Sequence, residues 1–509
     1  MAAHTPSAGA REPGGDTAEE PPALRRLLER IENRTCVVGV MGLGYVGLPL
    51  ANTFHAAGFR TLGFDTEEDV VASLTAGRSY LEHLPSADKV FRNLADSDRF
   101  SATTDMTRLG EVDAVMICVP TPLGKHFEPD LGYVESCGRS VAKTLTAGQL
   151  VILESTTYPG TTRERLLPIL TEGAHALVVG RDLFLAFSPE REDPGNQSHQ
   201  MSSIPKLVGG LDEPSGTAAC ALYRAAFESV LQVRNSEVAE AAKLVENIYR
   251  AVNIALVNEL KMVLARMDID IWEVLDAAET KPFGFHRFNP GPGWGGHCIP
   301  VDPFYLTWKA RSVGMHSHFI EHAGEINIQM PAYVVQHVQS ALNEARKPLN
   351  ASKVLLLGIA YKPNIGDTRE TPAFVIWKLL SESKADVSYY DPLVPRISGH
   401  LSEDLHFLLG KESVSNTDLP SAVAASDCIV VVTPHACFLP PLPAAAGRNF
   451  AEGAVATSGA GKAGPAVSPS HSAASGGGLL AGCLKGFAGP VVDTRNWIPK
   501  HWGLNVYRA

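Results

Sequence analysis

The stretch CVVGVMGLGYVGLPLANTF, residues 36–54, decides the fold of the region around it. Its first six residues are apolar or small and rich in valine, which is typical of a buried strand. The motif G-x-G-x-x-G follows at once with Gly42, Gly44 and Gly47, and a helical pattern continues to about residue 57. A strand, a glycine-rich turn and a helix in this order are typical of a dinucleotide-binding unit.

The residues of this turn favour NAD as the ligand. Gly42 permits the tight turn, Gly44 lets the backbone approach a pyrophosphate, and Gly47 lets helix and strand pack closely. The helix N-terminus offers free N–H groups to the phosphates. Asp65 ends the next strand, where a carboxylate accepts hydrogen bonds from the ribose hydroxyls and repels a 2′-phosphate. A glycine turn without a ligand and a surface carboxylate at Asp65 are the alternatives.

Short apolar segments alternate with helical patterns along the rest of the chain, which predicts an α/β fold. Further strands are expected at residues 60–65, 114–119, 150–155, 353–358, 386–390, 428–432 and 489–493. Fully apolar strands of this kind form parallel, doubly wound sheets. Residues 236–267 contain no Pro or Gly, which predicts a long helix that passes between domains or forms a dimer contact. The fold class is therefore two Rossmann-like doubly wound parallel-sheet domains joined by a helical domain with a long central helix.

The predicted domain limits follow from these patterns. We expect a disordered tail with a short helix at 1–33, a dinucleotide-binding domain at 34–215, a helical domain at 216–330 and a second Rossmann-like domain at 331–509. The short helix is expected at 24–31. Residues 442–482 are rich in Ala, Gly, Ser and Pro. We interpret them as a disordered insertion, because they cannot bury enough apolar surface to offset the entropy of ordering.

Composition narrows the class of protein. The 509 residues are 45% hydrophobic and 19% charged, which excludes a wholly disordered chain. A net charge of −11 leaves no basic surplus for nucleic acid or an anionic membrane. No apolar run approaches the ~20 residues that span a bilayer, and the N-terminus has no apolar signal segment. Eight cysteines without a C-x-x-C pair favour a reducing compartment, so we expect a cytoplasmic protein.

A second chemical signal is the loop PGPGWGGHCIPVDP, residues 290–303. Gly295 and Gly296 remove side chains beside Cys298, so that a bulky ligand can reach the sulfur. Asp302 follows four residues later, on the same side after one helical turn. A thiol beside a carboxylate suits covalent catalysis with acid/base help. A buried structural cysteine is the alternative, and no metal-ligand spacing surrounds the loop.

The predicted long helix carries Lys243 and Asn247 at positions i and i+4, hence on one face. A lysine and an amide side by side can stabilise a developing oxyanion. A solvated helix face with no catalytic role is the alternative, since Glu240 and Glu246 lie nearby.

Three blocks together carry a family resemblance: residues 40–49, the loop around residues 295–298, and GIAYKPNIGDTRETP at 358–372. With them the chain resembles the UDP-glucose/GDP-mannose dehydrogenase family over about residues 35–442 and 489–497. The sequence of the cysteine loop, residues 290–303, is most similar to that of the branch that oxidises UDP-N-acetylglucosamine at C6. The second α/β half keeps Gly358 but lacks a full second glycine motif, so we expect no second NAD site there.

The resemblance implies an NAD domain, a central dimerisation domain and a C-terminal UDP-binding domain, in a homodimer or higher homo-oligomer. It implies a two-step, four-electron oxidation of a UDP-sugar primary alcohol to a carboxylate. Cys298 would form a thiohemiacetal and then a thioester, which water cleaves. UDP-GlcNAc is the expected substrate, with UDP-ManNAc, UDP-GalNAc and UDP-glucose as alternatives. A non-catalytic nucleotide-sugar binder and a one-step alcohol dehydrogenase are the competing classes.

The resemblance also implies roles for individual residues. The implied catalytic residues are Cys298, Lys243, Asn247, Asp302, Thr121 and Glu190. The implied cofactor contacts are Gly42, Leu43, Gly44, Tyr45, Val46, Gly47, Asp65, Val119, Thr121, Thr156 and Arg369, and Glu154 and Ser155 would also face the cofactor. The implied substrate contacts are Glu190, Arg191, Lys243, Asn247, Phe288, Asn289, Pro290, Gly291, Gly295 and Lys362. No metal site is implied.

Two positions depart from the UDP-glucose pattern. Residues 191–194 read Arg-Glu-Asp-Pro after Glu190, so the second glutamate of the UDP-glucose enzymes has no clean match there, and Val301 stands where those enzymes carry a lysine. Both departures resemble the N-acetylhexosamine branch and argue against UDP-glucose.

Overall fold

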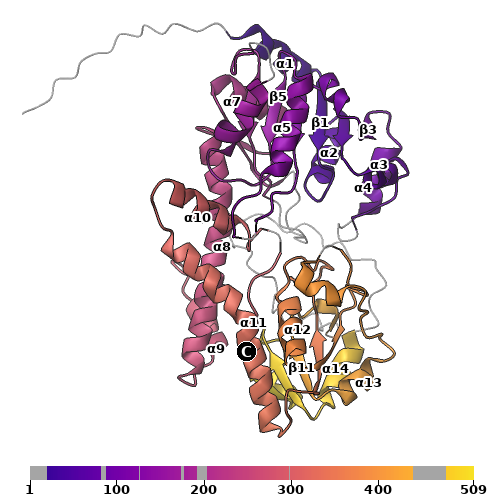
Figure 1. Cartoon of the computed structure of the whole chain (residues 1–509), viewed down its shortest axis with the longest axis vertical. Helices are drawn as coiled ribbons and strands as arrows, with labels where there is room; N and C mark the ends of the chain where they lie inside the picture. Colours follow the sequence, from indigo (N-terminus) through magenta and orange to yellow (C-terminus); the bar gives the residue numbers. More distant parts are fainter. Residues whose placement is uncertain are drawn as a thin grey trace, which may run out of the picture.

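The computed structural model describes residues 20–81, 87–124, 126–172, 177–191, 203–296, 298–399, 401–438 and 477–509. Two α/β domains lie at opposite ends of the molecule (Figure 1). Helices α8 (Ser236–Ala265) and α11 (His318–Glu344) connect them along one side. The short helix predicted at 24–31 is confirmed as α1 (Pro22–Glu32), while residues 1–19 of the predicted tail lie outside the described residues.

The first domain is built on one sheet with the strand order β3-β2-β1-β4-β5-β6-β7-β8. Its strands are β1 (Val37–Met41), β2 (Arg60–Phe64), β3 (Phe100–Thr103), β4 (Ala114–Ile117), β5 (Leu150–Leu153), β6 (Phe184–Phe187), β7 (Lys206–Gly210) and β8 (Val230–Val233). Neighbouring strands are parallel except β6 and β7. From β1 the chain runs outward to β2 and β3 and then crosses back to β4 on the other side of β1, so that Met41 pairs with both Phe64 and Ile117. The carboxyl ends of these strands are therefore level, and a crevice between β1 and β4 is where such sheets bind ligands.

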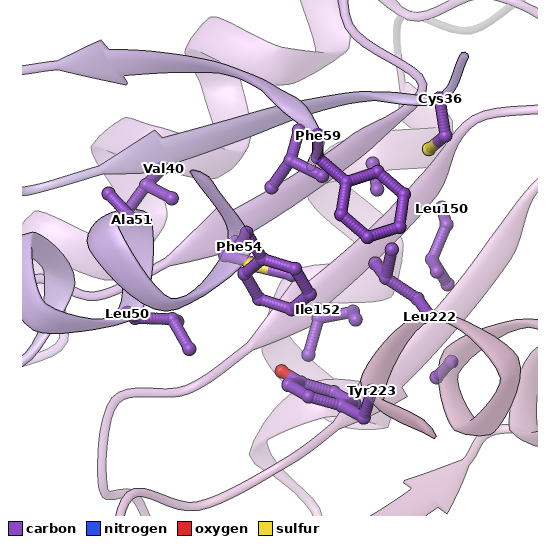
Figure 2. Packing of buried hydrophobic residues seen from close by; sticks show 14 of the residues in the cluster. Cys36, Val40, Leu50, Ala51, Phe54, Phe59, Leu150, Ile152, Leu222 and Tyr223 are labelled. Carbon is purple, nitrogen blue, oxygen red and sulfur yellow. The ribbon is translucent and has the colours of Figure 1, made fainter. Parts of the chain in front are cut away.

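Helices cover both faces of this sheet. They are α1, α2 (Gly47–Ala56), α3 (Glu68–Thr75), α4 (Ala87–Ala95), α5 (Gly132–Thr144), α6 (Leu167–Glu172) and α7 (Glu213–Arg224). Phe54 of α2 lies at the centre of one buried layer, with its ring centroid 6.0 Å from that of Phe59 and 5.8 Å from that of Tyr223 (Figure 2). Ile152 of β5 and Leu222 of α7 join the same fully buried cluster. This packing fixes α2, and with it the glycine turn at its start, against the sheet.

The second sheet has the order β10-β9-β11-β12-β13 and is parallel throughout. Its strands are β9 (Lys353–Leu357), β10 (Asp386–Tyr390), β11 (Cys428–Val431), β12 (Pro490–Asp493) and β13 (Asn505–Arg508). The helices packed on it are α11, α12 (Pro372–Glu382), α13 (Leu419–Ala425) and α14 (Gly477–Lys485). Two Rossmann-like domains and a long central helix are thereby confirmed.

Helix α14 corrects one prediction. The insertion predicted to be disordered up to residue 482 ends earlier, because residues from Gly477 onward are helical. Leu480 and Leu484 lie four residues apart and are fully buried in the core of the second domain. Because they share one face of the helix, these two leucines bury the apolar surface that the surrounding small residues lack. Residues 439–476 lie outside the described residues.

Two of the predicted domain limits, at residues 215 and 330, fall inside helices. Residue 215 lies within α7, and the first sheet continues to β8 at Val233. Residue 330 lies within α11, which extends from the helical domain onto the second sheet. The helical domain also contains α9 (Ile271–Glu279) and α10 (Asp302–Ser312). Within the part of the chain that the structure covers, no helix is long and apolar enough to cross a membrane.

Candidate functional site

The glycine loop, residues 42–47, follows β1 at the carboxyl edge of the first sheet. Gly42 has a φ of +87° and donates its N–H to the Phe64 carbonyl at 2.8 Å. A Cβ on Gly47 would lie 1.8 Å from the Gly42 carbonyl oxygen, so only glycine fits there. A Cβ on Gly44 would meet no atom within 4 Å. This open space beside the start of α2 fits the pyrophosphate of a dinucleotide.

Asp65 lies directly beside this loop. Its Oδ2 accepts the N–H of Leu43 at 2.9 Å, and its Oδ1 accepts the N–H of Glu67 at 3.1 Å. The carboxylate is partly exposed, so each oxygen retains a lone pair for a ligand. Tyr80 closes the same region by donating its hydroxyl to the Leu43 carbonyl at 2.5 Å. Asp65 is thus anchored to the glycine loop, as a ribose-binding acid requires, rather than being an isolated surface carboxylate.

The segments that follow β4 and β5 are joined by two hydroxyl groups. Ser155 Oγ donates to the Val119 carbonyl at 2.7 Å. Thr121 Oγ1 donates to the Thr156 carbonyl at 2.8 Å. The Thr121 proton is therefore directed into the protein, and the lone pairs of its oxygen remain as acceptors. The structure brings Val119, Thr121 and Thr156 together, as the sequence predicts.

Cys298 and Asp302 of the cysteine loop lie on one helical turn. Cys298 is exposed, which contradicts the alternative of a buried structural cysteine. Its carbonyl accepts the N–H of Asp302 at 2.8 Å. Asp302 begins α10 and is buried, with 3% of its surface exposed. Asn247 Nδ2 of α8 donates to Asp302 Oδ2 at 2.5 Å, and Lys243, one turn away, is also buried. The face of α8 that carries Lys243 and Asn247 is therefore not solvated.

Burial changes the acidity of Asp302. Removal from water raises the pKa of its carboxyl from 3.8 to about 6, although the charge of Lys243 and the hydrogen bond from Asn247 oppose that rise. A carboxylate with such a pKa is ionised at neutral pH and accepts a proton more readily than an exposed aspartate. Asp302 thereby has the properties of a general base.

The two sheets meet at the cysteine loop, residues 290–303. Gly296 donates its N–H to the Arg369 carbonyl at 3.1 Å. A Cβ on Gly295 would lie 2.8 Å from Tyr361 Cβ, so the loop packs closely on the second domain. The Arg369 guanidinium lies 4.6 Å from the ring centroid of Tyr45 in the glycine loop. Segments that follow β1 and β9 thus meet around the loop that carries the exposed thiol.

Comparison with protein families assigns the three parts of this architecture. Models of the UDP-glucose/GDP-mannose dehydrogenase family match residues 36–227 as the NAD binding domain, 237–329 as the central domain and 355–456 as the UDP binding domain. This chain belongs to the UDP-glucose/GDP-mannose dehydrogenase family. The dehydrogenase is an NAD-dependent oxidoreductase, and the glycine loop with Asp65 belongs to its NAD domain.

Individual relatives agree with this membership. The UDP-N-acetyl-D-glucosamine 6-dehydrogenase of Pseudomonas aeruginosa is 39% identical over 359 residues, which cover 70% of this chain and 83% of the relative. A UDP-N-acetyl-D-mannosamine dehydrogenase of Methanococcus maripaludis strain C7 is 32% identical over 78% of this chain and 86% of its own. The solved structure of the UDP-D-ManNAc dehydrogenase from Pyrococcus horikoshii superposes with a TM-score of 0.72 at 29% identity, covering 91% of this chain and 96% of that one.

Two residues beside Glu190 escaped the sequence analysis. Lys206, at the start of β7, lies with its Nζ 2.7 Å from Glu154 Oε2 and 3.3 Å from Glu190 Oε2. Tyr223 donates its hydroxyl to Glu154. Burial alone would lower the pKa of Lys206, but the two carboxylates raise it. The cation is therefore permanently charged, and it holds Glu190 of the dehydrogenase at the carboxyl edge of the sheet.

The predicted sugar-lining residues occupy the loop between α9 and α10. Gly291 donates its N–H to Asn258 Oδ1 at 2.9 Å, and its carbonyl accepts from Lys261 Nζ at 3.3 Å. A Cβ on Gly291 would lie 2.5 Å from Arg495 Nη1 of the second domain. Burial and the neighbouring Arg495 lower the pKa of Lys261 to about 7. Asn258, Lys261 and Arg495 support this loop, and no spacing in the sequence signals them.

The remaining predicted substrate contacts are held by neighbouring side chains. Arg191 forms an ion pair with Glu246 of α8 at 2.6 Å. Phe288 packs with its ring centroid 5.8 Å from that of Tyr249. Asn289 Oδ1 accepts from Arg287 Nε at 2.9 Å. Within the described ranges, no group of three His, Cys, Asp or Glu side chains is arranged to hold a metal ion.

Proposed function

We propose that this dehydrogenase oxidises C6 of UDP-N-acetylglucosamine to the carboxylate in two NAD-dependent steps through a covalent Cys298 intermediate. The observation that carries the proposal is the exposed thiol of Cys298, one turn before the buried Asp302. It lies in a loop whose Gly296 bonds to Arg369, the residue that contacts Tyr45 of the glycine loop. The relative that bears the UDP-GlcNAc 6-dehydrogenase name is 39% identical, against 31–33% for the UDP-ManNAc dehydrogenases. UDP-ManNAc is therefore the second candidate substrate.

The residues fit NAD, which accepts one hydride from the sugar carbon in each oxidation when it is bound. Asp65 is proposed to accept hydrogen bonds from the adenosine ribose, and Gly44 leaves room for the pyrophosphate. Arg369 is proposed to contact the cofactor from the second domain, because its guanidinium lies over Tyr45 of the glycine loop. Lys362 is proposed to bind the UDP, and residues 288–291 with Gly295 to line the sugar.

The sulfur of Cys298 is proposed to carry the sugar through two covalent intermediates. The first oxidation removes a hydride and the hydroxyl proton from C6 and gives the aldehyde. Cys298 Sγ then bonds to the aldehyde carbon, and the carbonyl oxygen takes up a proton to give a thiohemiacetal. The second oxidation removes a hydride and the hydroxyl proton and gives a thioester. Water adds to that carbon, the C–S bond breaks, and the acid and the free thiol are released.

The surrounding residues supply protons and charge stabilisation. Lys243 and the second amide N–H of Asn247 are proposed to donate to the oxygen that becomes negative when sulfur or water adds. Asp302 is proposed to accept a proton from the attacking water, for which its ionised carboxylate is suited. Thr121, whose hydroxyl proton is engaged by Thr156, is proposed to accept a hydrogen bond from that water. Glu190 is proposed to assist the same proton transfers.

Each molecule of UDP-GlcNAc is expected to yield two molecules of NADH, because the thioester route removes four electrons. The measurement is NADH absorbance at completion with limiting sugar, across UDP-GlcNAc, UDP-ManNAc, UDP-GalNAc, UDP-glucose and GDP-mannose. The highest kcat/KM is expected for UDP-GlcNAc. A ratio of one NADH per sugar would indicate an alcohol dehydrogenase that stops at the aldehyde, and a preference for UDP-ManNAc would move the enzyme to the second candidate.

A homodimer is proposed on the exposed face of α8. The exposed large apolar residues of this helix are Val238, Val245, Tyr249, Leu256, Leu260 and Val263. At 100° per residue they form one stripe about 60° wide. A second copy is the proposed occupant, since an apolar stripe of this length on a single helix is typical of a subunit contact. We also propose a cytoplasmic enzyme, because eight cysteines without a C-x-x-C pair favour a reducing compartment.

Replacing Leu256 and Val263 together with glutamate is expected to convert the dimer to a monomer, because four buried carboxylates cannot be hydrated in the contact. Sedimentation equilibrium measures the mass. The control is Val313→Glu, an apolar residue at the end of α10 that is more exposed than Leu256 and Val263 and lies outside α8. A wild-type protein that is monomeric at micromolar concentration, or a double variant that remains dimeric, would contradict the proposal.

A further inference from the structure

At the carboxyl edge of each sheet, a glycine bonds to the neighbouring strand and an aspartate directly follows that strand. The two aspartates differ in their exposure to solvent. Gly358, with a φ of +75°, donates its N–H to the Tyr390 carbonyl at 2.9 Å, just as Gly42 donates to Phe64. Asp391 then follows β10 as Asp65 follows β2. Asp65 is partly exposed, whereas Asp391 is fully buried. The strand-end acid of the second sheet is therefore inaccessible to a ribose.

Asp391 instead binds the lysine loop, residues 358–366. Its Oδ2 accepts the N–H of Ile359 at 2.8 Å and that of Ala360 at 3.3 Å. Its Oδ1 accepts the N–H of Leu393 at 2.9 Å. Bonds from these groups and from His435 hold the pKa of Asp391 below its usual value despite burial, which acts to raise it. The carboxylate is ionised and fully engaged within the protein.

His435, which follows β11 and is also buried, connects this acid to the other end of the lysine loop. Its Nε2 lies 3.0 Å from Asp391 Oδ2, and its Nδ1 lies 2.9 Å from the backbone nitrogen of Asn364. A backbone N–H can only donate, so Nδ1 is the acceptor and Nε2 carries the proton. The ring is thereby fixed in one tautomer, with Asp391 on one side and the loop on the other.

Lys362 lies between two anchored points of this loop. On one side, Ala360 is held by Asp391, and its carbonyl accepts from Thr433 Oγ1 at 2.6 Å. On the other side, Asn364 donates its N–H to His435 and accepts the N–H of Ala436 at 2.7 Å through its side chain. Only three residues, 361–363, separate the anchors, so the backbone of Lys362 has little freedom.

We propose that His435 is a positioning residue for substrate binding, which acts through the Nδ1 acceptor that holds Asn364 and so fixes Lys362 against the diphosphate of a UDP-sugar. The inference rests on the proposed function in one respect, namely that Lys362 binds UDP. Asp391 serves the same purpose by fixing the ring. The acid position that binds a ribose in the first domain thus supports the substrate loop in the second.

Two isosteric variants separate the two ring nitrogens. His435→Asn places an amide oxygen near the Nδ1 position and keeps the acceptor for Asn364. His435→Gln places an amide nitrogen near the Nε2 position, and keeps the donor to Asp391 while it loses the acceptor. In full-length protein titrated calorimetrically with UDP, the Gln variant is expected to raise the Kd about tenfold, equal to about 1.4 kcal/mol. The Asn variant is expected to raise it less than about threefold.

The matched readouts distinguish positioning from general damage. NAD affinity is expected to stay unchanged in both variants, and KM for the UDP-sugar is expected to rise in the Gln variant with kcat nearly unchanged. His406→Gln is the control, because His406 lies in the same domain and its exposed ring bonds to the Leu401 carbonyl. Hydrogen exchange of the Asn364 amide is expected to be faster in the Gln variant than in the Asn variant, whether or not UDP binds.

Three results would overturn the inference: UDP affinity equal to wild type in both variants, equal losses in both, or equal protection of the Asn364 amide. Failure of the wild-type protein to bind UDP, with faster exchange in the Gln variant, would instead refute the proposed role of Lys362 and leave the contact between His435 and the loop established.

Discussion

Replacing Cys298 with serine is expected to lower the rate of acid formation from the UDP-sugar by at least about a thousandfold. The serine hydroxyl has the same shape but stays protonated at neutral pH and is a far weaker nucleophile than a thiolate. The aldehyde can no longer be held as a thiohemiacetal, so the second oxidation loses its substrate. Because Cys298 is exposed, the exchange removes no buried contact, and affinity for NAD and UDP is expected to remain at the wild-type value.

The measurement is single-turnover NADH formation together with detection of the uronic acid. The serine variant is expected to give at most one NADH per active site and then stop. Cys483→Ser is the control, since Cys483 lies on α14 of the second domain, and this exchange is expected to leave turnover unchanged. Acid production at the wild-type rate by the Cys298 variant would remove this residue from the mechanism.

Replacing Asp302 with asparagine is expected to lower kcat by about a hundredfold to ten-thousandfold, the usual contribution of a general base. Asparagine preserves the size of the side chain and can still accept the Asn247 hydrogen bond, but it cannot take a proton from water. The thioester is then expected to accumulate on Cys298, so a burst of NADH formation should precede a slow steady state. Mass spectrometry of the quenched enzyme measures the covalent sugar adduct.

The pKa of Asp302 gives this prediction a direction in pH. Because burial raises that pKa to about 6, the carboxylate is protonated as the pH falls through about 6, and wild-type kcat is expected to fall about tenfold per pH unit below that value. The asparagine variant should lack this acid limb. The same limb in the variant would assign the base to another group. Asp404→Asn, an exposed residue of the second domain, is the control.

Stability is expected to change in the opposite direction to activity. A raised native pKa means that the folded protein binds the proton more tightly than the unfolded chain, so stability is highest below the ordinary pKa of 3.8 and is lost as the pH rises through about 6. At neutral pH the buried charge of Asp302 therefore costs about 3 kcal/mol. The asparagine variant should unfold at a higher temperature than wild type.

The sequence predicted those features of the fold that depend on local pattern. The apolar segments after Thr35 and before Gly358 form strands that helices cover on both faces. A strand buried on both faces is a continuous apolar run, which can be recognised in the sequence. The relation of Cys298 to Asp302 and of Lys243 to Asn247 was equally predictable, because spacing along a helical turn fixes which residues share a side. The structure adds the hydrogen bond that joins the two pairs.

Contacts between distant segments were not predictable in this way. Lys206 meets Glu154 across 52 residues and His435 meets Asp391 across 44, and nothing in the local pattern of either residue specifies its partner. A lysine at the start of an apolar strand is normally exposed to solvent, whereas the tertiary structure buries Lys206. The predicted limits at residues 215 and 330 fall within α7 and α11, because these helices continue without a break across them.

One residue, Arg369, contacts both the cysteine loop and the glycine loop. The carbonyl of Arg369 accepts from Gly296 beside the thiol, and the guanidinium of the same residue lies over Tyr45 beside the nicotinamide domain's phosphate turn. Any motion that separates the second domain from the first would break both contacts together. Under the proposed function, the cysteine loop and the glycine loop would then lose their shared partner at the same moment.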